Sequence, residues 1–405
     1  MNMEHKNDRA PAFSNVRKSF YKQVAEYDRK ENIQVIAVVL SIFLLATTLL
    51  ITSTIIESSS KDKYVYVYGD YTQSISTSLC LDSNVQLIDM NAFGNYCGLN
   101  KDKTGLFETF SVNNTYVSFE HGSEIAIVNG IKKEMPAKVQ IKNGYCLVPL
   151  TTIKEIFTSV EVLSDDKTIT ISKSDGIMYI YDKNPKPEYN MDVTSYLEYI
   201  NASNDYIYIL LNKQNPIDED FEPSNLVIIP EEYTHAYKHG TKVKLEETTA
   251  KALEAMLLAM NEDGIEDVFV QSAYRTHAYQ NVLFNTYIER EMEKGLSREQ
   301  ATINANKYSA KPEYSEHRTG LCIDFTTNSI NGAVDDVFET TEAYAWLKDN
   351  AWKYGFVMRY PENKEETTGY IYESWHYRFV GFEVAATMYQ TGLCYEEYLE
   401  IFGAK

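Results

Sequence analysis

The chain has 405 residues, a formal net charge of -20 and 44% hydrophobic residues, which allows two or three packed domains. This acidic balance disfavours a phosphate-binding surface of clustered Lys and Arg, so we predict no nucleic-acid partner. The five cysteines contain no Cys-x-x-Cys pair, which disfavours a cysteine-based zinc ribbon. Cys80 and Cys97 are candidates for a disulfide, and the sequence leaves that pairing open.

The first predicted element is a transmembrane helix at residues 33–56, a run that carries no charge. At about 1.5 Å rise per residue, a helix of this length crosses the roughly 30 Å hydrocarbon core of a bilayer. Its length and the lack of a small-residue cleavage pattern favour an uncleaved anchor over a cleaved signal peptide. A buried core helix is the weaker alternative for so long an uncharged run near a chain terminus.

Basic residues near the span predict its orientation. Five precede it and two follow it: Arg17, Lys18, Lys22, Arg29 and Lys30 before, Lys61 and Lys63 after. Because positive charge is retained on the cytoplasmic side, we expect residues 1–32 to form a cytoplasmic tail. The rest of the chain is then outside the cell, attached to the cell membrane by a single pass.

Residues 57–63 form a polar linker, and residues 64–173 have the pattern of a β-rich stalk domain. Tyr64–Tyr68 is a β-branched and aromatic run, typical of a strand. Lys167–Ile171 alternates polar and apolar residues, as a half-buried strand does. Asn-Gly pairs between such runs indicate turns, and a short helix is predicted at Leu150–Phe157.

Part of this stalk resembles the copper amine oxidase N-terminal-like domain, over about residues 115–173. The resemblance rests on the runs Val-Ser-Phe-Glu-His-Gly, Val-Asn-Gly and Cys-Leu-Val-Pro-Leu between Val117 and Leu150. In other proteins this domain is a spacer or a wall-contact module. Its name implies no copper here, because His121 stands alone beside a turn glycine and is interpreted as a surface residue.

A connector rich in Tyr, Asn and Asp, at residues 174–204, precedes a C-terminal domain at residues 205–405. The patterns of this domain mix helices and strands, so we predict the α+β class. The predicted elements are a strand at Ile207–Leu211, a helix at Thr248–Asn261, a strand at Val268–Val270, a helix at Ala278–Lys294 and a buried strand at Leu321–Phe325.

Three short stretches of this domain carry the residue types of a catalytic metal site. They are Ser-Glu-His-Arg-Thr-Gly-Leu-Cys-Ile-Asp ending at Asp324, Glu-Ser-Trp-His ending at His376, and Gln-Ser-Ala-Tyr-Arg ending at Arg275. Catalytic zinc typically keeps three protein ligands and one open position. His317, Asp324 and His376 can supply that set, and Gly320 permits the bend that turns the first two toward one point.

Two further residues have the chemistry of catalytic groups. Glu373 lies three residues before His376, where a carboxylate can stay off the metal and accept a proton from water. Arg275 stays cationic and can pair with a substrate carboxylate or with an oxyanion. Each residue alone has an ordinary structural explanation, and Cys322 is interpreted as a small core thiol rather than a ligand.

The combination resembles the VanY-type D-alanyl-D-alanine carboxypeptidases, a zinc-peptidase family, over about residues 206–390. The family signatures are Ser-x-His-x-x-Gly-x-Ala-x-Asp, Glu-x-Trp-His and Ser-x-Tyr-Arg. The matching positions are Ser272, Tyr274, Arg275, Ser315, His317, Gly320, Asp324, Glu373, Trp375 and His376. Cys322 stands where the family usually has Ala, and Ser374 where many members have Pro; neither change removes a ligand.

The resemblance implies a central antiparallel sheet and a zinc ion bound by His317, Asp324 and His376. It implies Glu373 as general base and then acid, and Arg275 at the developing oxyanion. Further candidates for substrate binding are Gln271, Ser272, Tyr274, Ser315, Tyr370 and Trp375, of which the last two are equally well interpreted as packing residues.

The implied reaction is zinc-dependent removal of the terminal D-alanine from a peptidoglycan stem peptide or its precursor. One alternative is an LD-carboxypeptidase that acts on tetrapeptide stems, and another is a non-catalytic cell-wall-binding protein. The helical stretch Tyr279–Lys307 lies between the Arg275 and His317 elements. It is either a lid over the cleft or, as we favour, an exposed helical hairpin.

Overall fold

The computed structural model describes residues 64–68, 71–75, 81–82, 85–142, 144–164, 168–182, 185–238 and 240–403. No helix within these ranges is long and apolar enough to cross a bilayer. The predicted tail, span and linker, residues 1–63, lie outside the described residues and stay predictions.

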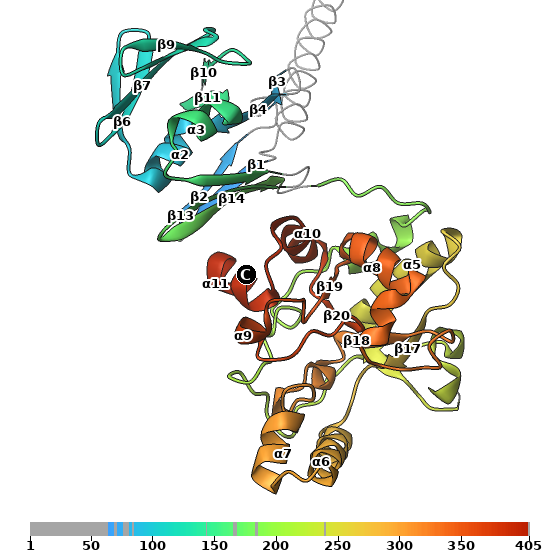
Figure 1. Ribbon diagram of the computed structural model, residues 1–405. Helices are drawn as coiled ribbons and strands as arrows, with labels where there is room; N and C mark the ends of the chain where they lie inside the picture. The colour runs from blue at the N-terminus through green and yellow to red at the C-terminus, as the bar shows by residue number, and fades with distance from the viewer. Residues whose placement is uncertain are drawn as a thin grey trace, which may run out of the picture. The chain divides into compact units, whose positions relative to one another are not determined.

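The stalk region is built from antiparallel strands, which form three sheets among the described residues (Figure 1). The strand orders are β12-β13-β14-β1-β2, β10-β11-β4-β3 and β5-β6-β7-β8-β9. The bounds are β1 (Tyr64–Tyr68), β2 (Tyr71–Ile75), β3 (Leu81–Asp82), β4 (Val85–Asp89), β5 (Asn100–Thr104), β6 (Phe107–Val112), β7 (Thr115–Glu120), β8 (Ile125–Val128), β9 (Ile131–Glu134), β10 (Gln140–Lys142), β11 (Tyr145–Pro149), β12 (Glu161–Ser164), β13 (Thr168–Lys173) and β14 (Gly176–Asp182). The strands predicted near residues 64–68 and 167–171 are therefore present as β1 and β13.

Two helices pack against these strands, α2 (Met90–Cys97) and α3 (Leu150–Ile156), the second as predicted. The buried Asp89 carboxylate starts α2 by accepting the backbone N–H groups of Asn91 and Ala92, at 3.2 and 3.3 Å. It also accepts the N–H of Cys146 on β11 at 2.9 Å, which ties the helix to the sheet. Cys97 is a free thiol, and Cys80, its candidate partner, lies outside the described residues.

The C-terminal domain is organised around the antiparallel sheet β17-β18-β20-β19, as the resemblance implied. Its strands are β17 (Phe269–Ser272), β18 (Cys322–Thr326), β19 (Phe356–Met358) and β20 (His376–Phe379). Side chains alternate between the two faces of a strand, so residues two apart share a face. Ile323 and Phe325 therefore face one way and Cys322 and Asp324 the other, although all four are buried.

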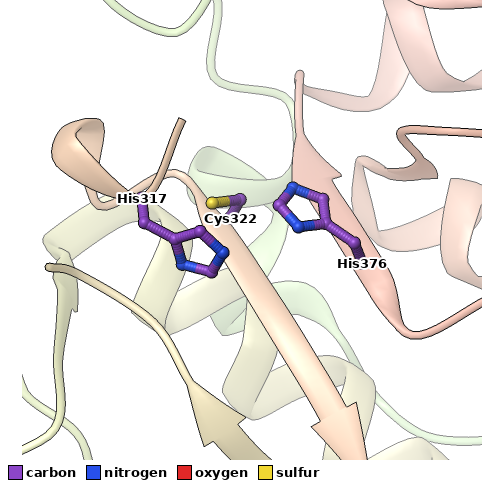
Figure 2. A group of neighbouring side chains, drawn as sticks. All are labelled: His317, Cys322 and His376. Atoms are coloured by element: carbon purple, nitrogen blue, oxygen red, sulfur yellow. The ribbon is translucent and has the colours of Figure 1, made fainter. Parts of the chain in front are cut away.

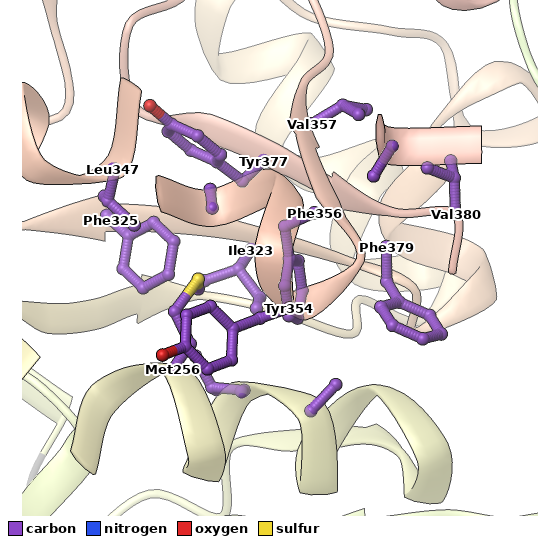
Figure 3. Packing of buried hydrophobic residues seen from close by; sticks show 14 of the residues in the cluster. Met256, Ile323, Phe325, Leu347, Tyr354, Phe356, Val357, Tyr377, Phe379 and Val380 are labelled. Carbon is purple, nitrogen blue, oxygen red and sulfur yellow. The ribbon is translucent and has the colours of Figure 1, made fainter. Parts of the chain in front are cut away.

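Helix α5 (Glu247–Glu262) covers the apolar face of this sheet (Figure 3). The Glu246 side chain accepts the N–H of Thr249 at 2.8 Å and fixes the start of the helix. Met256 from α5 packs with Ile323 and Tyr354 in the core cluster. Burying one such aliphatic side chain stabilises a fold by about 1.5–3 kcal/mol, so this packing holds the strands that carry the site.

Helices α6 (His277–Glu293) and α7 (Arg298–Ala305) form the predicted helical hairpin and pack against each other (Figure 1). Phe284, Ile288, Ala301 and Ala305 make a small core of their own between them. The Thr276 and Ser297 side chains accept N–H groups at the starts of the two helices.

The remaining elements of the domain are short. They are α4 (Leu197–Ile200), β15 (Leu226–Ile228), β16 (Lys244–Glu246), α8 (Glu342–Asn350), α9 (Glu365–Thr368), α10 (Phe382–Thr391), α11 (Tyr395–Phe402) and the 3₁₀ turns η2 (Thr194–Tyr196), η3 (Glu231–Tyr233), η4 (Ala236–Lys238), η5 (Pro312–Tyr314), η6 (Glu316–Thr319), η7 (Asp336–Thr340) and η8 (Ala351–Tyr354).

One predicted strand is wrong. Ile207–Leu211 is irregular rather than a strand. Its carbonyl groups do not enter a ladder, because those of Ile207 and Ile209 accept hydrogen bonds from the guanidinium of Arg378 at 2.8 and 2.9 Å. The apolar run indicates a buried segment, but a buried strand and a buried irregular segment have the same pattern.

Candidate active site

The pairing of β18 with β20 brings two of the predicted ligands together. Asp324 lies directly opposite His376 in the antiparallel register. Opposite residues of such a pair have their Cβ atoms about 4.5–5.5 Å apart and share a face. The Oδ1 atom of Asp324 lies 3.0 Å from Nδ1 of His376.

His317 reaches the same point from the turn η6, just before β18. Gly320 ends this turn with a φ of +69°, a conformation that favours glycine. The Nδ1 atom of His317 lies 2.6 Å from the carbonyl oxygen of Ala273. A carbonyl only accepts, so Nδ1 carries a proton and Nε2 is the nitrogen that remains to bind a metal. That Nε2 lies 3.2 Å from Oδ2 of Asp324.

The three side chains fit a zinc ion. Two ligands of a tetrahedral zinc site, each about 2.0–2.1 Å from the metal, lie about 3.3 Å apart. The contacts of Asp324 with His317 and His376, at 3.2 and 3.0 Å, have this spacing. The two imidazole rings are nearly perpendicular, at 88°, with centroids 5.0 Å apart. All three side chains are at most 5% exposed, so the donors are held in place by their surroundings.

Cys322 also belongs to this cluster. Figure 2 shows its sulfur beside the two imidazoles, and potential ligand atoms of Cys322, His317 and His376 all lie within 4.8 Å of one another. Burial alone raises the pKa of the thiol, but the nearby His317 and His376 outweigh burial and lower it to about 7. Asp324 also contacts both imidazoles at ligand spacing, through a different carboxylate oxygen for each. Cys322 is fully buried, as expected from the sequence, and it also lies beside the two imidazoles.

Glu373 lies beside the ligand cluster. Its Oε2 atom is 3.6 Å from Nδ1 of His376, and its backbone N–H donates to the carbonyl of Tyr360 at 3.0 Å. Burial raises the pKa of Glu373 to about 8, and the charge of His376 opposes this rise. A carboxyl group with a pKa near neutral both accepts and returns a proton readily.

Arg275 is held by three side chains. Its guanidinium donates to Oγ of Ser272 at 2.9 Å, to Oε1 of Gln280 at 3.1 Å and to Oδ2 of Asp324 at 2.5 Å. Its backbone N–H donates to the carbonyl of His317 at 3.0 Å. Burial raises the pKa of Asp324, but His317 and Arg275 outweigh it and hold that pKa well below its usual range. The carboxylate is therefore ionised, as a metal ligand must be.

A cavity of about 380 Å³ opens onto these groups. Every residue of the ligand set lines it, together with Arg275 and Glu373. Of the six predicted substrate-binding residues, Ser315, Tyr370 and Trp375 line the cavity, whereas Gln271, Ser272 and Tyr274 do not. Ser272 acts instead as an acceptor for Arg275. Trp375 also belongs to the hydrophobic core, so both interpretations of this residue hold.

Helix α6 supplies one wall of the cavity, which the sequence analysis did not predict. The lining residues are Gln280, Leu283, Tyr287 and Arg290. Their spacing of three, four and three residues places them on one face of a helix, and that period was a usable signal. The first helix of the hairpin therefore forms a wall of the site.

Ser374, which stands where many family members have Pro, is fully buried. Its hydroxyl has no hydrogen-bond partner among the described residues. Glu373 and His376, one residue before it and two after it, both line the cavity.

Comparison with known proteins decides the family. Residues 242–382 match the family model "VanY: D-alanyl-D-alanine carboxypeptidase". The bifunctional D-Ala-D-Ala dipeptidase and D-Ala-D-Ala carboxypeptidase VanXYC of Enterococcus gallinarum is 32% identical over 42% of this chain and 82% of its own length. The chain belongs to the VanY family. The predicted carboxypeptidase class is thereby confirmed.

Two further proteins are similar to this VanY-family chain. The putative carboxypeptidase YodJ of Bacillus subtilis is 37% identical over 48% of this chain and 67% of its own length. A solved vancomycin-resistance D,D-pentapeptidase VanY, in complex with Zn(II), is 33% identical with a TM-score of 0.40, and covers 48% of this chain and 99% of that one. Residues 67–173 match the copper amine oxidase N-terminal domain, a longer stretch than the sequence motifs indicated.

Proposed function

We propose that this chain is a zinc-dependent carboxypeptidase that removes the terminal D-alanine from peptidoglycan stem peptides. The observation that carries the proposal is the meeting of His317, Asp324 and His376 beside the buried Glu373, at the wall of one cavity. Membership of the VanY family supplies the substrate class.

His317 would hold the zinc ion through Nε2, His376 through Nδ1 and Asp324 through its carboxylate. Zinc, when bound, supplies a Lewis acid that lowers the pKa of a water molecule toward about 7. The hydrogen bond from His317 Nδ1 to Ala273 fixes the tautomer that leaves Nε2 available.

Glu373 accepts a proton from the attacking water and returns it to the amine nitrogen of the departing D-alanine. Burial raises the pKa of Glu373 to about 8 in the metal-free site. A zinc cation nearby would lower this pKa, so that the carboxylate could accept a proton near neutral pH. Because Glu373 lies 3.6 Å from Nδ1 of His376, it is close to the place of attack without needing to bind the metal itself.

Arg275 supplies positive charge at the same place. Its three hydrogen bonds hold the guanidinium against Asp324, so it needs little reorganisation during the reaction. It either binds the terminal carboxylate of the stem or stabilises the oxyanion of the tetrahedral intermediate. Arg290 adds a second cation to the cavity, and stem peptides carry carboxylates that suit this pair.

The test is hydrolysis of defined stems by the compact unit that begins at Asp62, supplied with zinc. Release of D-alanine from a pentapeptide stem, and not from a tetrapeptide, supports the proposal. Release from the tetrapeptide alone identifies an LD-carboxypeptidase. Release from neither, with binding to isolated wall retained, favours a non-catalytic wall-binding protein.

We also propose that residues 33–56 anchor the protein in the cell membrane with the catalytic domain outside, where peptidoglycan lies. The support is the uncharged run and the excess of basic residues before it. Protease added to intact cells should degrade the catalytic domain and spare a tag at the N-terminus. Protection of both ends would contradict this orientation.

The stalk would then set the reach of the catalytic domain above the bilayer. Deleting residues 64–173, with the anchor kept, should reduce trimming of intact wall more than hydrolysis of a soluble peptide. Equal effects on the two substrates would refute a role in reach.

A further inference from the structure

Glu316 is a fully buried carboxylate next to the metal ligands, and no catalytic role was predicted for it. Its Oε1 atom accepts two charged hydrogen bonds, from Nε of Arg359 at 2.9 Å and from Nη1 of Arg378 at 2.8 Å. The side chains of all three residues are 0% exposed. A buried arginine pair of this kind is costly without its carboxylate, so the position of Glu316 is tightly fixed.

The second oxygen of this carboxylate has no such partner. Oε2 of Glu316 is buried and makes no hydrogen bond among the described residues, and the same is true of Nε2 of His376. These two atoms face each other at 3.7 Å. Buried polar atoms are almost always paired, so two unpaired ones at this separation point to a bond that closes by a small movement.

We propose that Glu316 is a positioning residue that accepts a hydrogen bond from Nε2–H of His376 and so leaves Nδ1 of His376 available for the metal. The inference rests on the zinc site of the proposed function. An imidazole that binds metal through one nitrogen usually donates its other N–H to a carboxylate or carbonyl. His317 meets this condition through Ala273, and Glu316 is placed to meet it for His376.

The arginines determine how Glu316 acts. Arg359 and Arg378 occupy Oε1 with donors, so only Oε2 is left to face the imidazole. Arg359 is held in turn by Glu396, whose two oxygens accept from it at 2.6 and 2.8 Å. Arg378 is held by the carbonyls of Ile207 and Ile209. The irregular segment at residues 207–211 thus helps to fix a ligand of the site.

Glu316→Gln tests the tautomer directly. The two arginines require an acceptor, so the amide oxygen of Gln must face them and its NH₂ group must face His376. A donor at that place favours the tautomer in which Nδ1, rather than Nε2, carries the proton. Zinc affinity, measured by competition with a chelator, should fall about 10- to 100-fold.

Glu396→Gln is the matched control. It removes a negative charge from the same buried Arg359 but does not contact His376. We expect it to lower the melting temperature comparably and to leave zinc affinity within about threefold of wild type. An equal loss of zinc affinity in both variants, or none in a folded Glu316→Gln, would overturn the proposal.

A second measurement needs no variant. In the zinc-loaded protein with ¹⁵N-labelled histidine, NMR should show a proton on Nε2 of His376 and none on Nδ1. A proton on Nδ1, with zinc on Nε2, would overturn the proposal whether or not D-alanine is released. Release of no D-alanine, with the expected tautomer present, would instead count against the proposed function alone.

Discussion

Oε2 of Glu373 lies 3.6 Å from Nδ1 of His376, although one residue precedes β20 and the other begins it. The separation is too long for a strong hydrogen bond and leaves the carboxyl group free to exchange protons. Burial supplies the second condition, a pKa raised to about 8. Glu373 and His376 are therefore placed relative to each other by one short turn, in which the N–H of His376 donates to the carbonyl of Glu373 at 3.4 Å.

Glu373→Gln should lower kcat by at least about 10²-fold, because the amide cannot accept the proton of the attacking water. Zinc content, measured by atomic absorption, should remain near that of wild type. Glu366→Gln, an exposed change on α9, is the control and should leave kcat unaffected. A Glu373→Gln variant that keeps its rate would show that another group is the base.

The same substitution should stabilise the zinc-free protein at neutral pH. Above pH 4.5 the unfolded chain loses the proton of Glu373, while the folded state keeps it until the pH approaches 8. The free energy of unfolding therefore falls as the pH rises from 4.5 toward 8, and at pH 7 the loss is up to roughly 3 kcal/mol. With a chelator present, Glu373→Gln should raise the melting temperature at pH 7 and have little effect at pH 4. A gain of equal size at both values would contradict this linkage.

Gly320→Ala should destabilise the protein and weaken zinc binding together. A Cβ at this position would lie 2.9 Å from Cδ2 of Leu226 and 3.0 Å from the backbone nitrogen of Glu246. Gly392 has the same φ of +69° but open space around it. Gly392→Ala should therefore cost only the conformational term of about 1–2 kcal/mol. Thermal unfolding and zinc titration of both variants measure the difference; equal costs would mean that the close approach at Gly320 is unimportant.

Arg275→Lys should reduce kcat by about 10²-fold. A lysine keeps the charge but cannot reach Ser272, Gln280 and Asp324 at once, so the preorganised cation is lost. Arg298→Lys, at an exposed position of the hairpin, is the control. If Arg275 binds the terminal carboxylate instead of the oxyanion, KM should rise and kcat should change little. Unchanged kcat and KM would exclude both roles.

Arg290→Gln should raise KM for an intact stem peptide several-fold without lowering kcat. Arg290 lines the cavity from α6 but does not contact the ligand set, and its guanidinium lies 5.2 Å from the ring centre of Tyr287. The effect should diminish at high salt, because an exposed charge is screened. Arg298→Gln should change neither constant. An Arg290→Gln variant with normal KM at low salt would show that the hairpin wall does not bind substrate.

Local patterns were sufficient for much of the fold. The apolar period of Thr248–Asn261 predicted α5, and the predicted helix at Ala278–Lys294 is α6 within one residue at each end. The β-branched run at residues 64–68 is β1. In the two helices one face is buried and the other is exposed, so the period of hydrophobicity carries the information.

The same reasoning failed at Ile207–Leu211, where an apolar run is buried without forming a strand. The competing effect was a tertiary hydrogen bond, the donation of Arg378 to two carbonyls of this segment. Arg378 and Ile207 are 171 residues apart, so a local sequence pattern cannot predict this hydrogen bond or the irregular backbone that goes with it.

His317, Asp324, Glu373 and His376 could be named from the sequence because together they match the motifs of one peptidase family. Which atom of each side chain faces the other site residues follows only from the folded structure. For His317 it depends on the carbonyl of Ala273, and for His376 we propose that it depends on the carboxylate of Glu316. Hydrogen-bond direction is a property of three-dimensional contacts, so it appears only once the strands and the hairpin are assembled.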